Sequence, residues 1–223
     1  MIKDKRICLY DLPIFSGIDK IAFSRFCHAT NKHHKKKGEF LFHQGDPADA
    51  IYIVKEGTFK LVRTNKEGEE AIVQIVGKGE TIGETSLFKE NIFSPFSAIA
   101  LEEARVCSID GKTFETIIKS EPSVALQLIK NLGNRLYSTW EQIAESNRQT
   151  IQEKVLSLLV RLAAEHGEPC DKGTVIRVLL TQQDIASAVG ASRVMVSQVL
   201  KELTDRNYLS RDKKYYVLKD KCF

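Results

Sequence analysis

The clearest pattern of apolar and polar positions lies near the C-terminal end of the chain, in residues 181–206. Ile185, Ala188 and Val189 have helical spacing, and Gly190 then interrupts the pattern, as expected where a helix ends in a left-handed turn. A second helical pattern follows, with apolar positions at Val196, Val199, Leu200 and Leu203. Two short helices joined by a turn predict a helix-turn-helix, whose second helix can enter a DNA major groove. An ordinary helical hairpin is the alternative.

The residues before each of these helices suit the start of a helix. Thr181 and Ser192 have side-chain oxygens that can accept hydrogen bonds from the free backbone N–H groups of the first turn. The second helix leaves four residues outside its apolar face: Arg193, Val194, Ser197 and Gln198. We expect these four side chains to face the DNA bases.

Between Gly38 and Ile109 the pattern changes to short apolar segments that glycine-rich turns separate. The segments 51–54, 59–62 and 71–76 are examples. Many short strands at nearly even spacing predict a β-sandwich, a jelly roll or a small barrel.

A longer helical pattern begins at Pro122, a residue that fits the first turn of a helix. Its apolar stripe alternates spacings of three and four, and the positions are Leu126, Ile129, Gly133, Leu136, Trp140, Ile143 and Asn147. This seam predicts a two-stranded coiled coil and therefore a homodimer, in which Asn147 can fix the register. Arg135, Glu141 and Gln142 flank the seam as pairing residues do. The alternative is a helix that packs on its own barrel.

The last part of the chain continues the helix-turn-helix. Residues 151–166 predict an amphipathic helix, 168–173 a loop and 175–179 a strand. Residues 208–218 predict two strands around a charged turn, which would complete a winged helix with Lys213 and Lys214 at its tip. The predicted fold is α+β, with a double-stranded β-helix (jelly-roll) barrel in residues 1–122, a dimerisation helix in 123–147 and a winged helix in 148–223.

Composition and charge agree with this organisation. The chain has 223 residues, of which 43% are hydrophobic and 28% charged. No apolar run approaches the roughly 20 residues that span a bilayer, and the N-terminus lacks the apolar core of a signal peptide. We therefore expect a cytoplasmic protein without a membrane partner. The net charge is +4, and all of this excess falls in residues 148–223, as phosphate contacts would require.

The cysteine and histidine positions argue against a metal site. The five cysteines are widely scattered and include no Cys-x-x-Cys pair, so neither a disulfide framework, a zinc site nor an iron–sulfur cluster is expected. His33 and His34 would point to opposite faces of a strand, and His43 has no clear partner. We expect neither a bound metal nor enzymatic activity. The two rival hypotheses are a cupin-like metalloenzyme and a nucleotide-binding regulatory subunit.

The order of barrel, long helix and winged helix resembles the Crp/Fnr family of bacterial transcription regulators, over almost the whole chain. The marks of this resemblance are Gly45-Asp46, Tyr52-Ile53-Val54 with Gly57, Gly77 and Gly79, Ile82-Gly83-Glu84 followed by Leu87-Phe88, and Val189-Gly190-Ala191-Ser192-Arg193. Each glycine would mark a turn that a side chain would obstruct. The resemblance implies a homodimer that binds double-stranded DNA, with RNA polymerase as a further partner.

The resemblance also implies an effector pocket. The family's founding effector is cyclic AMP, and Glu84, after Gly83, is similar to the carboxylate that contacts its ribose. Where the family has an arginine and a serine, this chain reads Ser94-Pro95. Thr139 matches a purine-contacting threonine, but Trp140 replaces a serine of the partner subunit. Since a partly buried phosphate without a cation is unfavourable, we expect that cyclic AMP is not the effector.

The residues around this pocket leave its content open. Ile92, Phe93, Phe96 and Trp140 indicate an apolar lining. The pocket can be filled by its own side chains, or it can hold an aromatic or other apolar small molecule. Sensing by haem or by redox chemistry is the third possibility. Haem would use one of His28, His33, His34 and His43; a thiol switch would use Cys27 or Cys107.

For the DNA contacts, the resemblance assigns a role to each outward residue of the second helix. Arg193 corresponds to an arginine that contacts guanine, as bidentate donation to O6 and N7 allows. Val194 replaces a glutamate and can touch a thymine methyl group, whereas Ser197 matches a polar reader. Gln198 stands where a second arginine is usual, and glutamine prefers adenine. The expected phosphate contacts are Ser192, Thr181, Lys213 and Lys214.

The sequence as a whole predicts a dimeric transcription regulator that responds to an effector or to redox state. It would bind near-palindromic promoter sites and would not depend on cyclic AMP. The alternative is a nucleotide- or metal-binding cupin-like protein that does not act on DNA.

Overall fold

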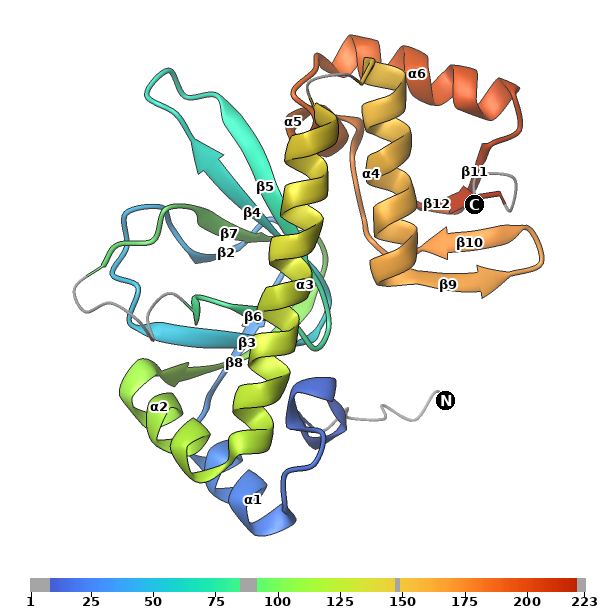
Figure 1. Ribbon diagram of the computed structural model, residues 1–223. Coiled ribbons are helices and arrows are strands. Elements are labelled where there is room, and N and C mark those ends of the chain that lie inside the picture. The colour runs from blue at the N-terminus through green and yellow to red at the C-terminus, as the bar shows by residue number, and fades with distance from the viewer. Residues whose placement is uncertain (1–8, 85–91, 147–148, 220–223) are drawn as a thin grey trace. The chain divides into compact units, whose positions relative to one another are not determined.

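The computed structural model describes residues 9–84, 92–146 and 149–219 (Figure 1). The chain divides into two compact units, of which Met1–Arg63 with Ile75–Trp140 form the first. Thr64–Gln74 with Glu141–Phe223 form the second. Among the described residues, no helix is both long enough and apolar enough to cross a membrane.

Two four-stranded antiparallel sheets build the barrel-like part of the chain. The first has the order β1-β8-β3-β6, with β1 at Asn31–Lys35, β8 at Ala104–Asp110, β3 at Ala50–Glu56 and β6 at Thr81–Ile82. The second has the order β2-β7-β4-β5, with β2 at Phe40–Phe42, β7 at Ser97–Ala100, β4 at Phe59–Thr64 and β5 at Glu70–Val76. The predicted β-barrel with short strands is thus confirmed.

Strand β3 shows how the barrel separates two hydrophobic cores. Side chains alternate between the faces of a strand. Ile51 and Ile53 belong to one buried cluster, whereas Val54 belongs to another, in which residues of both sheets, such as Val106 and Phe59, pack together. The second cluster is the interior of the barrel.

Helices cover the outer face of the first sheet. They are two 3-10 turns, η1 (Leu9–Asp11) and η2 (Pro13–Phe15), followed by α1 (Lys20–His28), α2 (Gly111–Ser120) and the start of α3 (Pro122–Ser146). Phe26 of α1, Phe114 of α2 and Val124 of α3 are completely buried in the cluster that contains Ile51 and Ile53. This packing anchors the N-terminal end of α3 to the barrel.

Glycine is required at two turns of the barrel. Gly57 has a φ of +80°, and a Cβ atom there would lie 2.6 Å from the carbonyl oxygen of Glu103. Gly83 has a φ of +90°, and its Cβ would lie 2.5 Å from the carbonyl oxygen of Ala50. Both positions therefore exclude a side chain by backbone conformation and by space.

The second unit contains the winged helix. Its helices are α4 (Ile151–His166), α5 (Gln182–Val189) and α6 (Arg193–Asp205). Its sheet has the order β11-β12-β10-β9, with β11 at Leu209–Asp212, β12 at Tyr215–Leu218, β10 at Gly173–Ile176 and β9 at Gly167–Cys170. The predicted helix-turn-helix and wing are confirmed.

One local prediction in this unit was wrong. Residues 168–173 were expected to form a loop, but β9 pairs with β10 as a hairpin, with Val175 opposite Glu168. Pro169 is compatible with this strand because β9 is at the edge of its sheet, where proline is tolerated.

Candidate functional site

The two ends of α5 are each fixed by local structure. The hydroxyl group of Thr181 accepts from the backbone N–H of Asp184 at 3.1 Å, and the carboxylate of Asp184 accepts from the N–H of Thr181 at 2.9 Å. Gly190 ends α5 in the left-handed conformation, with φ 67° and ψ 41°. The bonds of Thr181 and Asp184 satisfy groups that a helix start otherwise leaves unpaired, and the left-handed Gly190 ends α5 before the turn that leads to α6.

Helix α6 leaves outside its buried face the four residues that were expected to face DNA bases. Ser192 caps it, since its hydroxyl oxygen accepts from the N–H of Met195 at 3.3 Å. Arg193, Val194 and Gln198 are exposed, and Ser197 is half-buried. The opposite face is buried, as expected: Val196, Val199, Leu200 and Leu203.

Met195 is an exposed apolar residue that the sequence analysis did not single out. Its side chain is 46% exposed, beside Val194 at 77%. Two apolar side chains on an exposed helix start suit contact with thymine methyl groups. The position of Met195 in the first turn of α6, next to the residues expected to contact DNA bases, could have identified it from the sequence.

The wing carries cations that pack on aromatic rings. Lys213 lies in the turn between β11 and β12, with a positive φ of 54°. The Lys214 ammonium group lies 5.3 Å from the Tyr215 ring centroid. Arg177, which the sequence analysis did not mention, lies 5.2 Å from the same ring and bonds the carboxylate of Glu168 at 2.6 Å. Such stacking orients the cations at modest energetic gain.

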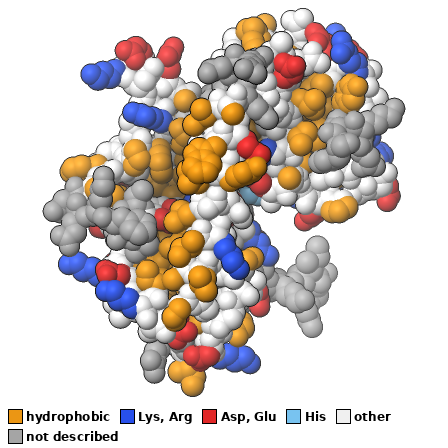
Figure 2. Space-filling model, viewed as in Figure 1, with side chains coloured by type: hydrophobic (Ala, Val, Ile, Leu, Met, Phe, Trp, Pro, Cys, Tyr) orange, Lys and Arg blue, Asp and Glu red, His pale blue; other side chains and the backbone are white. Residues whose placement is uncertain are grey.

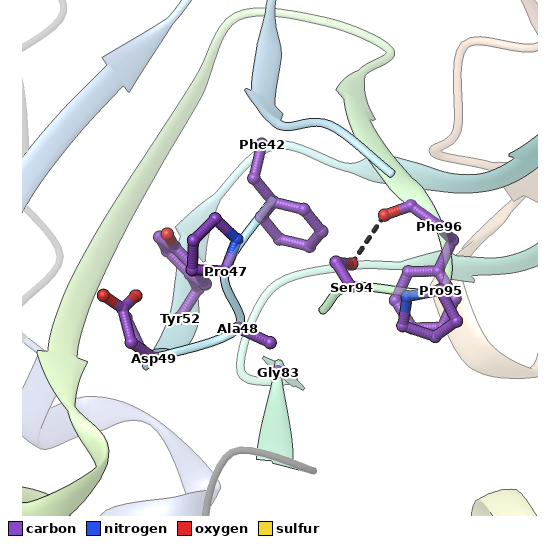
Figure 3. A pocket seen from close by; sticks show the side chains of 10 residues that line it. Phe42, Pro47, Ala48, Asp49, Tyr52, Gly83, Ser94, Pro95 and Phe96 are labelled. Atoms are coloured by element: carbon purple, nitrogen blue, oxygen red, sulfur yellow. Dashed lines mark hydrogen bonds between the residues drawn. The ribbon is translucent and has the colours of Figure 1, made fainter. Parts of the chain in front are cut away.

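The barrel contains a small pocket that is partly open to solvent. Its lining residues, most of which Figure 3 labels, are Phe42, Pro47, Ala48, Asp49, Ala50, Tyr52, Gly83, Ser94, Pro95 and Phe96. Gly83, Ser94 and Phe96 were expected there. Phe42 and Tyr52 were missed, because they come from strands β2 and β3, far from Gly83 in the sequence.

The polar groups of the pocket lie close to partners within the protein. The hydroxyl group of Ser94 donates to the carbonyl oxygen of Phe96 at 2.6 Å (Figure 3). Burial raises the pKa of Tyr52, and the carboxylates of Asp49 and Asp46 raise it further. The lining residues that the structure describes include no lysine or arginine. The described lining is therefore mainly apolar, and Asp49 is the one charged side chain among these lining residues.

Glu84 follows the pocket residue Gly83 and bonds to the long helix. Its carboxylate lies 2.8 Å from Nη1 of Arg135 on α3 and also accepts from the hydroxyl group of Thr81. Nη2 of Arg135 donates to the carbonyl oxygen of Thr81 at 2.7 Å and lies 3.5 Å from the carboxylate of Glu80. The side chains of Arg135 and Glu84 are 20% and 11% exposed. Arg135 thus ties α3 to the barrel, whereas the sequence analysis had placed it beside the dimer seam.

Five of the expected pocket residues are not part of the lining in the single chain: Ile92, Glu84, Phe93, Thr139 and Trp140. Phe93 is 67% exposed and Trp140 is 59% exposed. The hydroxyl group of Thr139 donates to the backbone carbonyl of Arg135, one turn earlier in α3.

Helix α3 has a row of exposed apolar side chains, and Figure 2 shows hydrophobic atoms gathered along it. Five large seam residues are between 49% and 64% exposed: Leu126, Ile129, Leu136, Trp140 and Ile143. A Cβ at Gly133 would meet no atom within 4 Å. Asn147 lies outside the described residues. An exposed apolar stripe at heptad spacing is typical of a helix that packs against a second helix.

The candidate redox and metal-binding residues are dispersed. Burial raises the pKa of the Cys107 thiol, while Cys27 is half-buried and Cys170 exposed; Cys8 and Cys222 lie outside the described residues. Nε2 of His33 lies 2.7 Å from the hydroxyl group of Ser108. In the part of the chain that the structure describes, no three His, Cys, Asp or Glu side chains group as metal ligands would.

Comparison with known proteins gives two family matches. Residues 32–121 match the family described as cyclic nucleotide-binding domain, and residues 153–221 match the Crp-like helix-turn-helix domain. Together these matches cover the barrel and the winged helix.

Similar proteins span nearly the whole chain. A CRP-like cAMP-activated global transcriptional regulator of Mycobacterium tuberculosis is 29% identical over 209 residues, which cover 93% of this chain and 92% of that protein. A global nitrogen regulator of Nostoc is 28% identical over 180 residues, covering 80% and 81%. The structure of the c-di-GMP responsive regulator CLP of Xanthomonas campestris has a TM-score of 0.73 at 22% identity, covering 90% of this chain and 99% of that one.

Proposed function

Since this chain belongs to the Crp/Fnr family and is a DNA-binding transcription regulator, we propose that it acts as a homodimer on near-palindromic promoter sites. We propose further that an effector other than cyclic AMP, or a change of redox state, controls it. The family match does not favour the cupin-like alternative. The relatives are transcription regulators, and we propose no catalytic activity. RNA polymerase as a partner and a cytoplasmic location complete the proposal.

The observation that carries this proposal is the exposed apolar stripe of α3. Five large apolar side chains at heptad spacing are between 49% and 64% exposed, and a second copy of the same helix would cover them. Burial of apolar surface contributes roughly 25 cal/mol per Å², so the stripe would supply a substantial part of the association energy. In this arrangement residues 1–122 form the sensing barrel, 123–147 the dimerisation helix and 148–223 the DNA-binding domain.

The proposed base contacts come from the first two turns of α6. Arg193 would donate to guanine, Val194 would contact a thymine methyl group, and Ser197 and Gln198 would read neighbouring base edges. Ser192, Thr181, Lys213 and Lys214 would contact phosphates. Because a homodimer has two-fold symmetry, the site would contain two half-sites about one helical turn apart.

The proposed effector differs from cyclic AMP because the pocket lacks a cation among its described residues. The hydroxyl group of Ser94 already donates to Phe96, and the carboxylate of Glu84 is bonded to Arg135 and Thr81. Among the described lining residues a phosphate would meet the carboxylate of Asp49 and no cation, at a cost in affinity. An uncharged apolar molecule fits the lining of Phe42, Pro47 and Phe96 better.

A direct contact links the pocket to the dimer helix. Gly83 lines the pocket and Glu84 bonds Arg135 of α3. An occupant that shifts Gly83 would move Glu84 and would change how α3 is held. The resulting population shift is a coupling free energy of about 1–3 kcal/mol, and DNA would tighten effector binding by the same factor.

The experiment that tests this function is operator selection with the purified full chain. A random-sequence duplex library should yield a near-palindrome, and sedimentation should show one dimer per duplex. Native mass spectrometry with an absorption spectrum, on protein purified without oxygen, should show any bound effector or haem. Failure to enrich any sequence, or binding of a single monomer, would contradict the proposal.

A further inference from the structure

Gln198 and Glu202 form a pair on the exposed side of α6. Nε2 of Gln198 donates to Oε1 of Glu202 at 3.3 Å. The two residues lie four positions apart and therefore share a face of the helix. Gln198 is exposed and Glu202 is half-buried. We propose that Glu202 is a positioning residue that holds the amide of Gln198 in the orientation that reads adenine, an inference that rests on the proposed DNA contact of α6.

The chemistry of the two groups fixes which end of the amide Glu202 binds. A carboxylate only accepts hydrogen bonds, whereas the two ends of a glutamine amide are a donor and an acceptor. Rotating the Gln198 amide by half a turn would place its carbonyl oxygen against the Glu202 carboxylate. That arrangement brings two acceptors together, so the bond selects one orientation.

The selected orientation leaves a defined pattern for a base. With one N–H bonded to Glu202, Gln198 still offers its carbonyl oxygen and its second N–H. Adenine presents the N6 donor and the N7 acceptor in the major groove, and this pair matches the two remaining groups of the amide. Guanine presents O6 and N7, which are both acceptors. The carbonyl oxygen of a fixed Gln198 would face O6 of guanine without a hydrogen bond.

A free glutamine would discriminate less. It could turn its amino group toward guanine and donate to O6 or N7 as readily as it pairs with adenine. The role of Glu202 is thus to exclude the wrong base, and specificity of this kind depends on what the site rejects. Apart from this role, a carboxylate on a helix that approaches the DNA phosphates would repel them and weaken binding to every sequence.

The test uses the full-length dimer and the selected operator. The base pair that faces Gln198 is identified as the one whose preference disappears in the Gln198→Ala variant. Fluorescence anisotropy then compares two duplexes that carry adenine or guanine at this pair. We expect the natural protein to prefer adenine about tenfold, as one base mismatch commonly produces, and Glu202→Ala to prefer it about twofold or less.

Two variants separate hydrogen bonding from charge. Glu202→Gln removes the charge but keeps an oxygen that can accept from Gln198, so it should retain more adenine preference than Glu202→Ala. Asp205→Ala removes a carboxylate from the same helix and leaves the pair intact, so it should retain the tenfold preference. The guanine preference at Arg193 should be unchanged in all three variants, which shows that α6 still docks.

Several results would overturn the inference. One is an unchanged adenine preference in Glu202→Ala, and another is equal loss of preference in Glu202→Ala and Asp205→Ala. A selected operator without adenine preference opposite Gln198 would refute this inference and leave the proposed function intact. If the natural protein enriched no sequence, the proposed function would fail and the inference with it.

Discussion

The exposed face of α6 that is proposed to contact DNA bases differs from the pocket of the barrel in how its side chains are bonded. On α6, Arg193 and Val194 are exposed, and Ser192 caps the start of the helix. In the pocket, Ser94 donates to a carbonyl of its own segment, and the neighbouring Glu84 is bonded to Arg135. Arg193 and Val194 are therefore available to a partner, whereas Ser94 and Glu84 already have partners within the chain. Under the proposed function, an effector in this pocket would shift the protein between two states only as far as its affinity for the two states differs.

The largest expected effect concerns the dimer on which the exposed face of α6 depends. Leu136→Glu would place two carboxylates in the apolar seam, and their burial should raise the dimer dissociation constant by about 100-fold or more. Operator binding should fall in parallel, although α6 is unchanged. Sedimentation velocity and anisotropy measure the two effects. Asn134→Glu, on an exposed position beside the seam, is the control and should leave both constants unaltered; a dimeric Leu136→Glu protein would argue against the seam.

The next effect concerns the ion pair behind the pocket. Arg135→Met leaves the Glu84 carboxylate nearly buried without its cation, and we expect the free energy of unfolding to fall by about 2 kcal/mol, less than for a fully buried pair because Arg135 is 20% exposed. Glu84→Gln in the same chain should restore part of this loss. Chemical denaturation measures both. Lys119→Met, which removes an exposed partner of Glu115, should have little effect. Equal losses of unfolding free energy in Arg135→Met and Lys119→Met would show that the Arg135–Glu84 pair contributes no more than an exposed pair.

A smaller effect should appear at one base pair of the operator. Arg193→Ala should cost about 1–3 kcal/mol and should relax the preference for guanine at its contact. Lys214→Ala should instead weaken binding to all sequences alike and should reduce the salt dependence. Titrations against operators with single base changes distinguish the two. Uniform weakening by Arg193→Ala would mean that this residue contacts phosphate.

The smallest effect is a pH dependence within the barrel. Burial lowers the pKa of His33 below 6.5, and Lys35 lowers it further. The unfolded chain then binds a proton more readily than the folded one, so the stability contribution present above pH 6.5 is lost as the pH falls below that value. Unfolding at several pH values should show a smaller slope for His33→Gln between pH 6.5 and 5. An identical slope in both proteins would exclude His33 as the cause.

Much of the fold could be predicted because its signals are local. The caps at Thr181 and Ser192, the left-handed Gly190 and the heptad stripe of α3 each depend on residues a few positions apart. The pocket depends on Phe42, Tyr52 and Ser94, which only the pairing of distant strands brings together. The bonds of Arg135 could not be predicted for the same reason, because its partners Glu84 and Thr81 lie more than 50 positions away.

The central claim is that this regulator binds its operator as a dimer without cyclic AMP as the effector. Its most direct test is calorimetric titration of cyclic AMP into the dimer, with the selected operator absent and then present. We predict no binding at micromolar concentration and an unchanged operator affinity. A micromolar or tighter dissociation constant that tightens further when operator is present would contradict the account.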